Sequence, residues 1–340
     1  MARAVVLGGS GLIGSAVALR LLEQGWEVDI TGRESSHVPA SLTSLGVRFH
    51  EVDRGDVSAQ RRLLGEGAEL LVDTVCFTAA DARALVPILG DVESVAMISS
   101  KAVYVDEQGR HANSLDLPVF DGPIAETAPT MTPGAGEATT RDGYGANKVA
   151  AEHVLLDSGH PVSVLRVGKA HGLRSARPRE WMFVRRVLDR REAVLLADGG
   201  RGTDQTTAAA NVAALVDTVA RHPDARILNA ADPDAPSVLE IAQTVASHLG
   251  HRWREALLEP DDDPALGIHP WRTAAPVVLD TSAARALGWQ PAGGYADTVA
   301  DMLDELVDRA AADTALFADD PFFAPLFGYA AEDAWLQRHP

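Results

Sequence analysis

The sequence has a single cysteine, Cys76, among its 340 residues. One thiol cannot form an internal disulfide, so a disulfide-stapled secreted domain is excluded and a reducing compartment is favoured. The chain also lacks any apolar run approaching the roughly 18 residues that a membrane span needs. Its opening residues run directly into a glycine turn, with no signal-peptide cleavage site after them. We therefore expect a cytoplasmic protein.

Basic residues are few compared with acidic ones: 30 Lys and Arg stand against 48 Asp and Glu, which gives a formal net charge of −18. Such a chain repels phosphate backbones at long range, so we expect no nucleic-acid partner. Because no apolar run is long enough to span a bilayer, we also expect no membrane partner. An anionic cofactor is still compatible with this charge, because its site relies on local backbone amides and one or two cations. The expected partner is a small-molecule substrate.

Strand and helix patterns alternate along most of the chain. We expect strands at 3–8, 27–31, 47–52, 70–77, 94–99 and 162–167, and helices at 12–24, 81–89, 144–156, 181–191, 237–249 and 295–311. Residues 105–142, rich in Pro, Gly, Asp and Thr, predict a long surface loop. The alternation predicts an α/β fold, a Rossmann-type doubly wound parallel sheet with a smaller C-terminal substrate domain. We assign 1–172 and about 205–232 to an NADP-binding domain, and 173–204 and 233–340 to a smaller substrate-binding region.

A glycine turn separates the first predicted strand from the first predicted helix. Its sequence is Gly8-Gly9-Ser10-Gly11-Leu12-Ile13-Gly14, with the spacing G-x-x-G-x-x-G. The first glycine of such a turn permits a tight bend, the second lets a pyrophosphate approach the backbone, and the third lets the helix pack closely. The candidate dinucleotide-binding residues here are Gly8, Ser10, Gly11, Leu12, Ile13 and Gly14.

The end of the second predicted strand indicates which dinucleotide would bind. NAD sites usually have an acid there to hold the ribose 2′-hydroxyl, but this chain has Thr31-Gly32-Arg33. A guanidinium can bind a 2′-phosphate through two parallel hydrogen bonds. NADP(H) is therefore favoured, and NAD(H) remains an alternative. Asp53, with Arg54 beside it, follows the third strand and is a candidate for the adenine side.

A tyrosine and a lysine four residues apart are the candidate proton-transfer groups. On a helix, Tyr144 and Lys148 would lie on one face. We expect the ammonium to lower the pKa of the phenol and so make it a usable acid–base group. Ser100 follows a predicted strand, at the edge where parallel α/β sheets bind ligands, and could donate a hydrogen bond to a substrate oxygen.

These segments together resemble a known family. Gly-Gly-Ser-Gly-Leu-Ile-Gly at 8–14, Ser-Ser-Lys-Ala-Val-Tyr at 99–104 and Tyr-Gly-Ala-Asn-Lys at 144–148 look like the extended short-chain dehydrogenase/reductases, the NAD-dependent epimerase/dehydratase group. The stretches 165–172 and 229–232 fit two later motifs, so the resemblance covers roughly residues 3 to 230. It implies that Tyr144 is the acid–base, that Lys148 also holds the nicotinamide ribose, and that Ser100 completes a triad. It further implies that Phe77 and Thr78 line the cofactor, and that the protein is a homodimer.

The chain also departs from that family. Where 4,6-dehydratases carry an Asp-Glu pair, it has Lys101 and Ala102, which disfavours removal of water. Asp204 stands near the place of an arginine that serves the substrate pyrophosphate, and we expect its carboxylate to repel a diphosphate. Arg201, or the group Arg174, Arg177 and Arg179, could replace that arginine. The substrate therefore need not be a nucleotide sugar.

Three functions are weighed. The first is an NADP(H)-dependent reductase or dehydrogenase acting at a carbonyl or alcohol carbon, and the second is a nucleotide-sugar epimerase with tightly bound NAD(P). The third is a non-catalytic cofactor-binding sensor or RNA-associated protein, since fold does not fix function. We expect no metal site, because His248 and His251 have no evident third ligand. For His171, and for Trp181, Met182 and Phe183, both substrate contact and core packing remain open.

Overall fold

The computed structural model describes residues 2–65, 67–259 and 261–339. Its centre is a parallel sheet of seven strands in the order β10-β6-β5-β4-β1-β2-β3. In chain order, these strands are β1 (Arg3–Leu7), β2 (Glu27–Gly32), β3 (Arg48–Glu51), β4 (Ala68–Asp73), β5 (Val92–Ser100), β6 (Val162–Val167) and β10 (Arg226–Ala230). From the neighbouring strands β1 and β4 at its centre, the sheet continues through β2 and β3 on one side and through β5, β6 and β10 on the other. Sheets of this kind bind ligands at the carboxyl ends of the strands where the order changes direction, which here is between β1 and β4. The predicted Rossmann-type α/β fold is confirmed.

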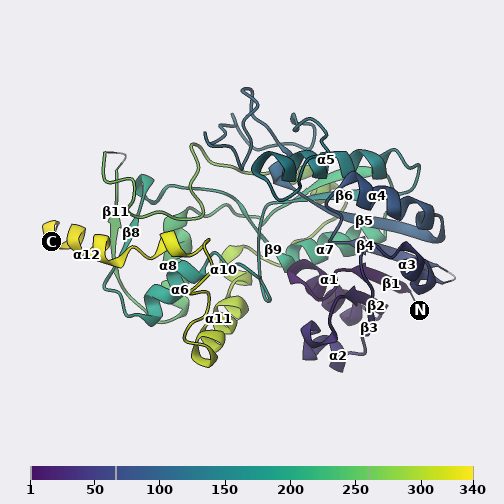
Figure 1. The fold of residues 1–340 in the computed structure, drawn as a ribbon, viewed down its shortest axis with the longest axis horizontal. Coiled ribbons are helices and arrows are strands. Elements are labelled where there is room, and N and C mark those ends of the chain that lie inside the picture. The colour runs from purple at the N-terminus through teal and green to yellow at the C-terminus, as the bar shows by residue number, and fades with distance from the viewer. Residues whose placement is uncertain (1, 66, 260, 340) are drawn as a thin grey trace.

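Helices cover both faces of the sheet (Figure 1). On one face, Ala4 and Val6 of β1 pack with α1 (Leu12–Glu23), α2 (Ala40–Ser44) and α7 (Ala209–Ala220). On the other face, Val5 and Leu7 pack with α3 (Val57–Leu64), α4 (Ala79–Leu85) and α5 (Arg141–Leu156). Because successive strand side chains point to opposite sides, a strand segment buried on both faces must be apolar, as β1 is from Ala4 to Leu7.

The C-terminal part of the chain has a core of its own, at the opposite end of the molecule from the N-terminus (Figure 1). The helices of this part are α6 (Trp181–Leu188), α8 (Val238–His248), α10 (Tyr295–Thr298), α11 (Ala300–Ala312) and α12 (Tyr329–Arg338). The short helix α9 (Ser282–Ala286) instead packs on the core of the seven-stranded sheet through Ala284. Two short parallel pairs accompany them, β7 (Lys169–His171) with β9 (Thr206–Ala208), and β8 (Ala193–Leu196) with β11 (Arg254–Leu257). Trp181, Met182 and Phe183 are buried in this core, which settles their role in favour of packing.

Several element boundaries differ from the predicted ones. β4 ends at Asp73 rather than at 77, so Cys76 and Phe77 lie beyond the sheet edge. α4 ends at Leu85, and the chain continues as a 3₁₀ turn that contains Pro87. The helix predicted at 295–311 is two helices, α10 and α11. Helices α2, α3, α7, α9 and α12 were not predicted.

The long loop before α5 is ordered by its own hydrogen bonds. Residues 105–140 contain no helix or strand beyond isolated bridges. The Asp106 carboxylate accepts hydrogen bonds from the backbone N–H groups of Gln108, Arg110 and Val119. A loop pinned in this way can hold side chains over the sheet edge. No described helix is long and apolar enough to cross a membrane.

The glycine turn gives a matched pair of stability predictions. A Cβ on Gly14 would lie 2.7 Å from the Gly9 Cα, whereas a Cβ on Gly11 would meet only the Gly8 carbonyl oxygen, at 3.5 Å. We expect Gly14→Ala to lower the free energy of unfolding by about 1–3 kcal/mol, as overpacking does. Gly11→Ala should unfold at the wild-type urea concentration. Equal unfolding midpoints for the two variants would contradict this account.

Candidate active site

The catalytic tyrosine candidate is positioned by a close contact between α5 and the end of β5. Thr140 caps the helix, and its Oγ1 accepts a hydrogen bond from the Gly143 N–H at 3.0 Å. A Cβ on Gly145 would lie 2.6 Å from the Ala102 carbonyl oxygen, so only glycine allows this approach. The result is that the phenol of Tyr144 lies near the hydroxyl of Ser100, although the two residues come from segments far apart in the sequence.

Lys148, one turn further along α5, joins the ends of two neighbouring strands. Its Nζ donates hydrogen bonds to the carbonyl oxygens of Cys76 at 2.8 Å and Ile98 at 2.9 Å. The ammonium also lies 4.6 Å from the centre of the Phe77 ring. The structure therefore brings Ser100, Tyr144, Lys148 and Phe77 to one edge of the sheet.

The pKa of Tyr144 differs from the sequence-based expectation. Burial raises the pKa of the phenol, and the nearby Ser100 hydroxyl opposes that rise only in part. Lys148 is not among the groups that shift it. The expected lowering by Lys148 is thus corrected: in this structure the phenol keeps its proton throughout the neutral range.

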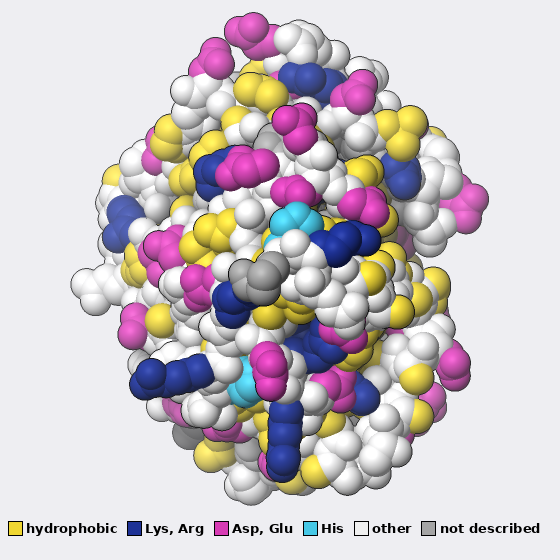
Figure 2. Space-filling model, turned by 90° about the vertical axis from the view of Figure 1, so that its left-hand side faces the viewer, with side chains coloured by type: hydrophobic (Ala, Val, Ile, Leu, Met, Phe, Trp, Pro, Cys, Tyr) yellow, Lys and Arg dark blue, Asp and Glu magenta, His cyan; other side chains and the backbone are white. Residues whose placement is uncertain are grey.

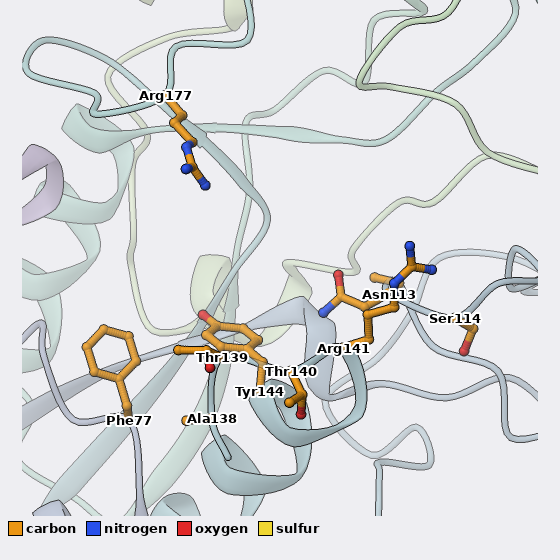
Figure 3. Close-up of a pocket in the computed structure, with 10 residues that line it drawn as sticks. Phe77, Asn113, Ser114, Ala138, Thr139, Thr140, Arg141, Tyr144 and Arg177 are labelled. Carbon is orange, nitrogen blue, oxygen red and sulfur yellow. The ribbon is translucent and has the colours of Figure 1, made fainter. Parts of the chain in front are cut away.

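A cavity of about 910 Å³ opens beside Tyr144. Figure 3 shows the Tyr144 ring on its floor, Phe77 to one side, and Arg177 reaching in from the opposite wall. Its described lining residues are Phe77, Ala112, Asn113, Ser114, Ala138, Thr139, Thr140, Arg141, Tyr144 and Arg177. The charged side chains among these are both arginines, so the cavity is locally basic in an acidic chain. Sequence reasoning missed the contribution of Asn113 and Ser114, because nothing in a loop sequence shows where the loop folds back.

The glycine turn fits the phosphates of a dinucleotide. Gly8 has φ +79°, which is the left-handed conformation that glycine favours. Helix α1 begins after Gly11 without a side-chain cap and has no acid in its first turn. Its first N–H groups, including those of Leu12 and Ile13, and the positive end of its dipole are thus available to an anion.

The remaining cofactor candidates lie in different settings. Arg33 is exposed directly after β2, next to Gly32. The Asp53 carboxylate accepts a hydrogen bond from the Gly55 N–H, while Arg54 donates to the buried Asp73 carboxylate at 2.7 Å. Thr78 caps α4 through a reciprocal contact with Asp81. The side chains of Arg54 and Thr78 are therefore already engaged within the protein.

Asp204 is neutralised by two lysines. Its carboxylate forms ion pairs with Lys101, directly after Ser100, and with Lys169 at 2.8 Å. All three side chains are largely buried, so the pairing is what makes their burial tolerable. The expectation that Asp204 would repel a diphosphate is therefore corrected, because its charge is compensated. Arg201, in contrast, pairs with Glu259 on the exposed surface.

The segment 229–232 holds two parts of the site region in place. Asn229 accepts a hydrogen bond from the Tyr104 hydroxyl at 2.7 Å and donates to the Ile124 carbonyl in the long loop. Asp232 contacts His171 Nε2 at 2.9 Å, and both side chains are buried. Burial tends to raise the pKa of Asp232, but its hydrogen bond with His171 contributes to a net lowering. The structure thus assigns His171 to the packed interior.

The single cysteine and the two histidines considered as metal ligands lie in separate surroundings. Burial raises the pKa of the Cys76 thiol to about 12, so it is protonated and a poor nucleophile. His248 Nε2 contacts Asp304, whereas His251 Nε2 contacts the Arg191 carbonyl. Among the described residues, no group of three His, Cys, Asp or Glu side chains could hold a metal ion.

The fold and the site define a class of protein. It is a Rossmann-type α/β protein with a glycine turn after β1 and with Ser100, Tyr144 and Lys148 at the carboxyl edge of the parallel sheet. The family comparison is more specific. The model of the NAD dependent epimerase/dehydratase family matches residues 4–231, so the chain belongs to that family and is an enzyme of it. No curated protein matches.

Solved structures show the same fold at low identity. A dTDP-glucose 4,6-dehydratase from Bacillus anthracis in complex with NAD has a TM-score of 0.69 at 12% identity, covering 92% of this chain and 98% of that one. A UDP-glucose-4-epimerase from Stenotrophomonas maltophila with bound NAD and formylated UDP-arabinopyranose has a TM-score of 0.69 at 21% identity, covering 92% and 100%. A UDP-glucuronic acid 4-epimerase from Bacillus cereus, in complex with UDP-glucuronic acid and NAD, has a TM-score of 0.67 at 15% identity, covering 90% and 99%.

The lysine pairs of Asp204 give a further stability prediction. Asp204→Asn leaves Lys101 and Lys169 buried without their counter-charge, so the free energy of unfolding should fall by about 3 kcal/mol. Asp198→Asn is the matched control, because the Asp198–Arg272 pair is more exposed and should cost at most about 1 kcal/mol. Both values can be read from urea denaturation. Equal losses in the two variants would show that the lysine pairs do not support the fold.

Proposed function

We propose that this enzyme is an NADP(H)-dependent oxidoreductase that transfers hydride at a carbonyl or alcohol carbon. The observation that carries the proposal is that Tyr144 lines a large cavity and that the Ser100 hydroxyl lies near its phenol. A phenol and a hydroxyl beside one cavity can share a substrate oxygen, one moving its proton and the other orienting it. Lys148 lies behind them, against the Phe77 ring.

Each residue of the set has one task in this proposal. When bound, the nicotinamide supplies or accepts a hydride at the substrate carbon. Tyr144 donates its proton to the substrate oxygen during reduction, and Ser100 holds that oxygen by a hydrogen bond. Lys148 fixes α5 against the ends of β4 and β5 through the carbonyls of Cys76 and Ile98. Backbone N–H groups from Gly11 to Ile13 would hold the pyrophosphate.

The proton state of Tyr144 supports the reducing direction. Because burial raises the pKa of this phenol, it carries its proton at neutral pH and is ready to donate. Oxidation would need the phenolate and should therefore gain from higher pH. An epimerase needs both directions in one cycle, which is why we place it second. In its favour, two of the similar structures are sugar-nucleotide 4-epimerases with NAD.

The cofactor preference rests on the end of β2. Arg33 is exposed there, and no acid is present at Thr31-Gly32-Arg33 to bind a ribose 2′-hydroxyl. The similar structures named above contain NAD, but at 12–21% identity their residues at this strand end need not match. We therefore propose NADP(H), with NAD(H) as the alternative.

Substrate and partners follow from the cavity and the surface. Arg141 and Arg177 at the cavity favour a polar or anionic small molecule. Lys101, which stands where 4,6-dehydratases carry an acid, disfavours removal of water.

Acidic and basic side chains are interspersed on the face shown in Figure 2. This pattern and the charge of −18 support no nucleic-acid partner, which disfavours the RNA-associated alternative. A cytoplasmic homodimer without a membrane partner completes the proposal, on the grounds given from the sequence.

Tyr144→Phe tests the catalytic role. With NADPH and a panel of aldehydes, ketones and nucleotide-linked sugars, the wild type should consume NADPH with at least one compound. Tyr144→Phe should lower that rate at least about 100-fold while dinucleotide binding survives, because general acid catalysis contributes about this much. A wild-type rate in the variant would refute the role of Tyr144. Conversion of a sugar by the wild type without net loss of NADPH would establish the epimerase alternative.

Arg33→Ala tests the cofactor preference. Loss of a charge-assisted contact to the 2′-phosphate should weaken NADPH binding about tenfold and leave NADH binding unchanged, as measured by fluorescence titration. Arg201→Ala, an exposed arginine paired with Glu259, is the control and should alter neither affinity. An equal loss for both dinucleotides on Arg33→Ala, or none for either, would argue against recognition of the 2′-phosphate by Arg33.

A further inference from the structure

Arg174 lies in the segment between β7 and α6, outside the first strand–helix–strand unit. Its backbone has φ +65°, an uncommon conformation for a residue other than glycine. The Arg174 N–H donates a hydrogen bond to the Glu305 carboxylate of α11 at 2.9 Å. The backbone is therefore anchored in the C-terminal part of the molecule, and observed strain of this kind is a reason to ask about function.

The side chain of Arg174 extends in another direction, onto the glycine turn. Its Nε donates to the Ser10 carbonyl oxygen at 3.1 Å, and its Nη2 donates to the His37 carbonyl oxygen. Among the described residues, no carboxylate forms an ion pair with this guanidinium, although the chain has 48 acidic residues. The guanidinium of Arg174 thus bridges the glycine turn and the segment after β2 without an acidic partner in the described part of the chain.

Those two contact points border the places where a dinucleotide carries its phosphates. Ser10 lies in the turn between Gly8 and Gly11, where the pyrophosphate binds in Rossmann-type sites. His37 follows Arg33, at the strand end where the adenosine ribose binds. Backbone carbonyls are weaker partners for a guanidinium than phosphate oxygens are. The arginine can therefore exchange these carbonyls for a phosphate at little cost.

We propose that Arg174 is a phosphate-binding residue of the dinucleotide site, contributed by the C-terminal part of the chain. This inference rests on the proposed function, because it requires a dinucleotide at the glycine turn. The phosphate is either the pyrophosphate, common to both dinucleotides, or the 2′-phosphate of NADP alone. Through Arg174 and its anchor on Glu305, cofactor binding would fasten α11 to the turn before α1.

The neighbouring arginines do not share this position. Arg177 pairs with Asp320 at 3.0 Å and lines the cavity beside Tyr144. Arg179 donates to the Ala170 carbonyl at 3.3 Å. Of the three arginines that the sequence places together, only Arg174 contacts the glycine turn, so its removal should affect the dinucleotide specifically.

Calorimetric titration of NAD⁺ and NADP⁺ into the full-length chain tests the inference. Two variants remove the guanidinium, Arg174→Gln and Arg174→Gly, and the glycine also relieves the positive φ, so that variant should fold at least as well as the wild type. Arg201→Gln is the matched control for loss of a surface charge. Melting temperatures of all variants report on folding.

We expect both variants to bind more weakly by about tenfold, the value of one charge-assisted contact. Equal loss for NAD⁺ and NADP⁺ assigns Arg174 to the pyrophosphate, and loss for NADP⁺ alone assigns it to the 2′-phosphate. Arg201→Gln should bind as the wild type does. Wild-type affinity of Arg174→Gly for both dinucleotides would overturn the inference while leaving the proposed function intact. Failure of the wild type to bind either dinucleotide would overturn both.

Discussion

The close approach of α5 to the carboxyl end of β5 is the constraint on which the rest of the site depends. Gly145 permits it, because any side chain would meet the Ala102 carbonyl. Lys148 then holds the helix in place through the carbonyls of Cys76 and Ile98. Tyr144 can reach Ser100 only because both conditions are met. A lysine used in this way is part of the scaffold before it is part of any chemistry, and it is not among the groups that shift the pKa of the phenol in this structure.

Charge in the interior is organised by pairing. Asp204 lies between Lys101 and Lys169, and Glu152 binds Arg166 at 2.7 Å. Each group would be costly to bury alone. The same principle explains how a chain of net charge −18 can present arginines at its cavity: the acids in the interior are matched locally, while the excess of acidic charge lies elsewhere. A local potential, and not the total charge, decides what a cavity accepts.

The sequence predicted best where glycines and capping residues mark the chain. The first strand, turn and helix are confirmed within a residue or two, because Gly8 and Gly25 mark the ends of their elements. Helix α7 escaped prediction because β9 runs straight into it, with Ala208 as an uncapped start and no Gly or Pro between them. Asp204 forms an ion pair with Lys101, about a hundred residues earlier in the chain. No local sequence pattern shows a contact between residues so far apart. Tyr144 shows the remaining limit, since its spacing from Lys148 is visible in sequence but the burial that sets its pKa is not.

The three arginines of one short segment show why a charge cluster in sequence is a poor guide to a single site. Positive φ at Arg174 and the proline at 178 turn the chain between them, so consecutive cations point in different directions. One reaches the glycine turn, one enters the cavity beside Tyr144, and one turns back to the strand at Ala170. A segment with these contacts touches both the glycine turn and the cavity beside Tyr144, and its backbone is fixed to α11 through Glu305. Where each of these cations acts is therefore decided by the backbone of the segment and not by the spacing of the arginines in the sequence.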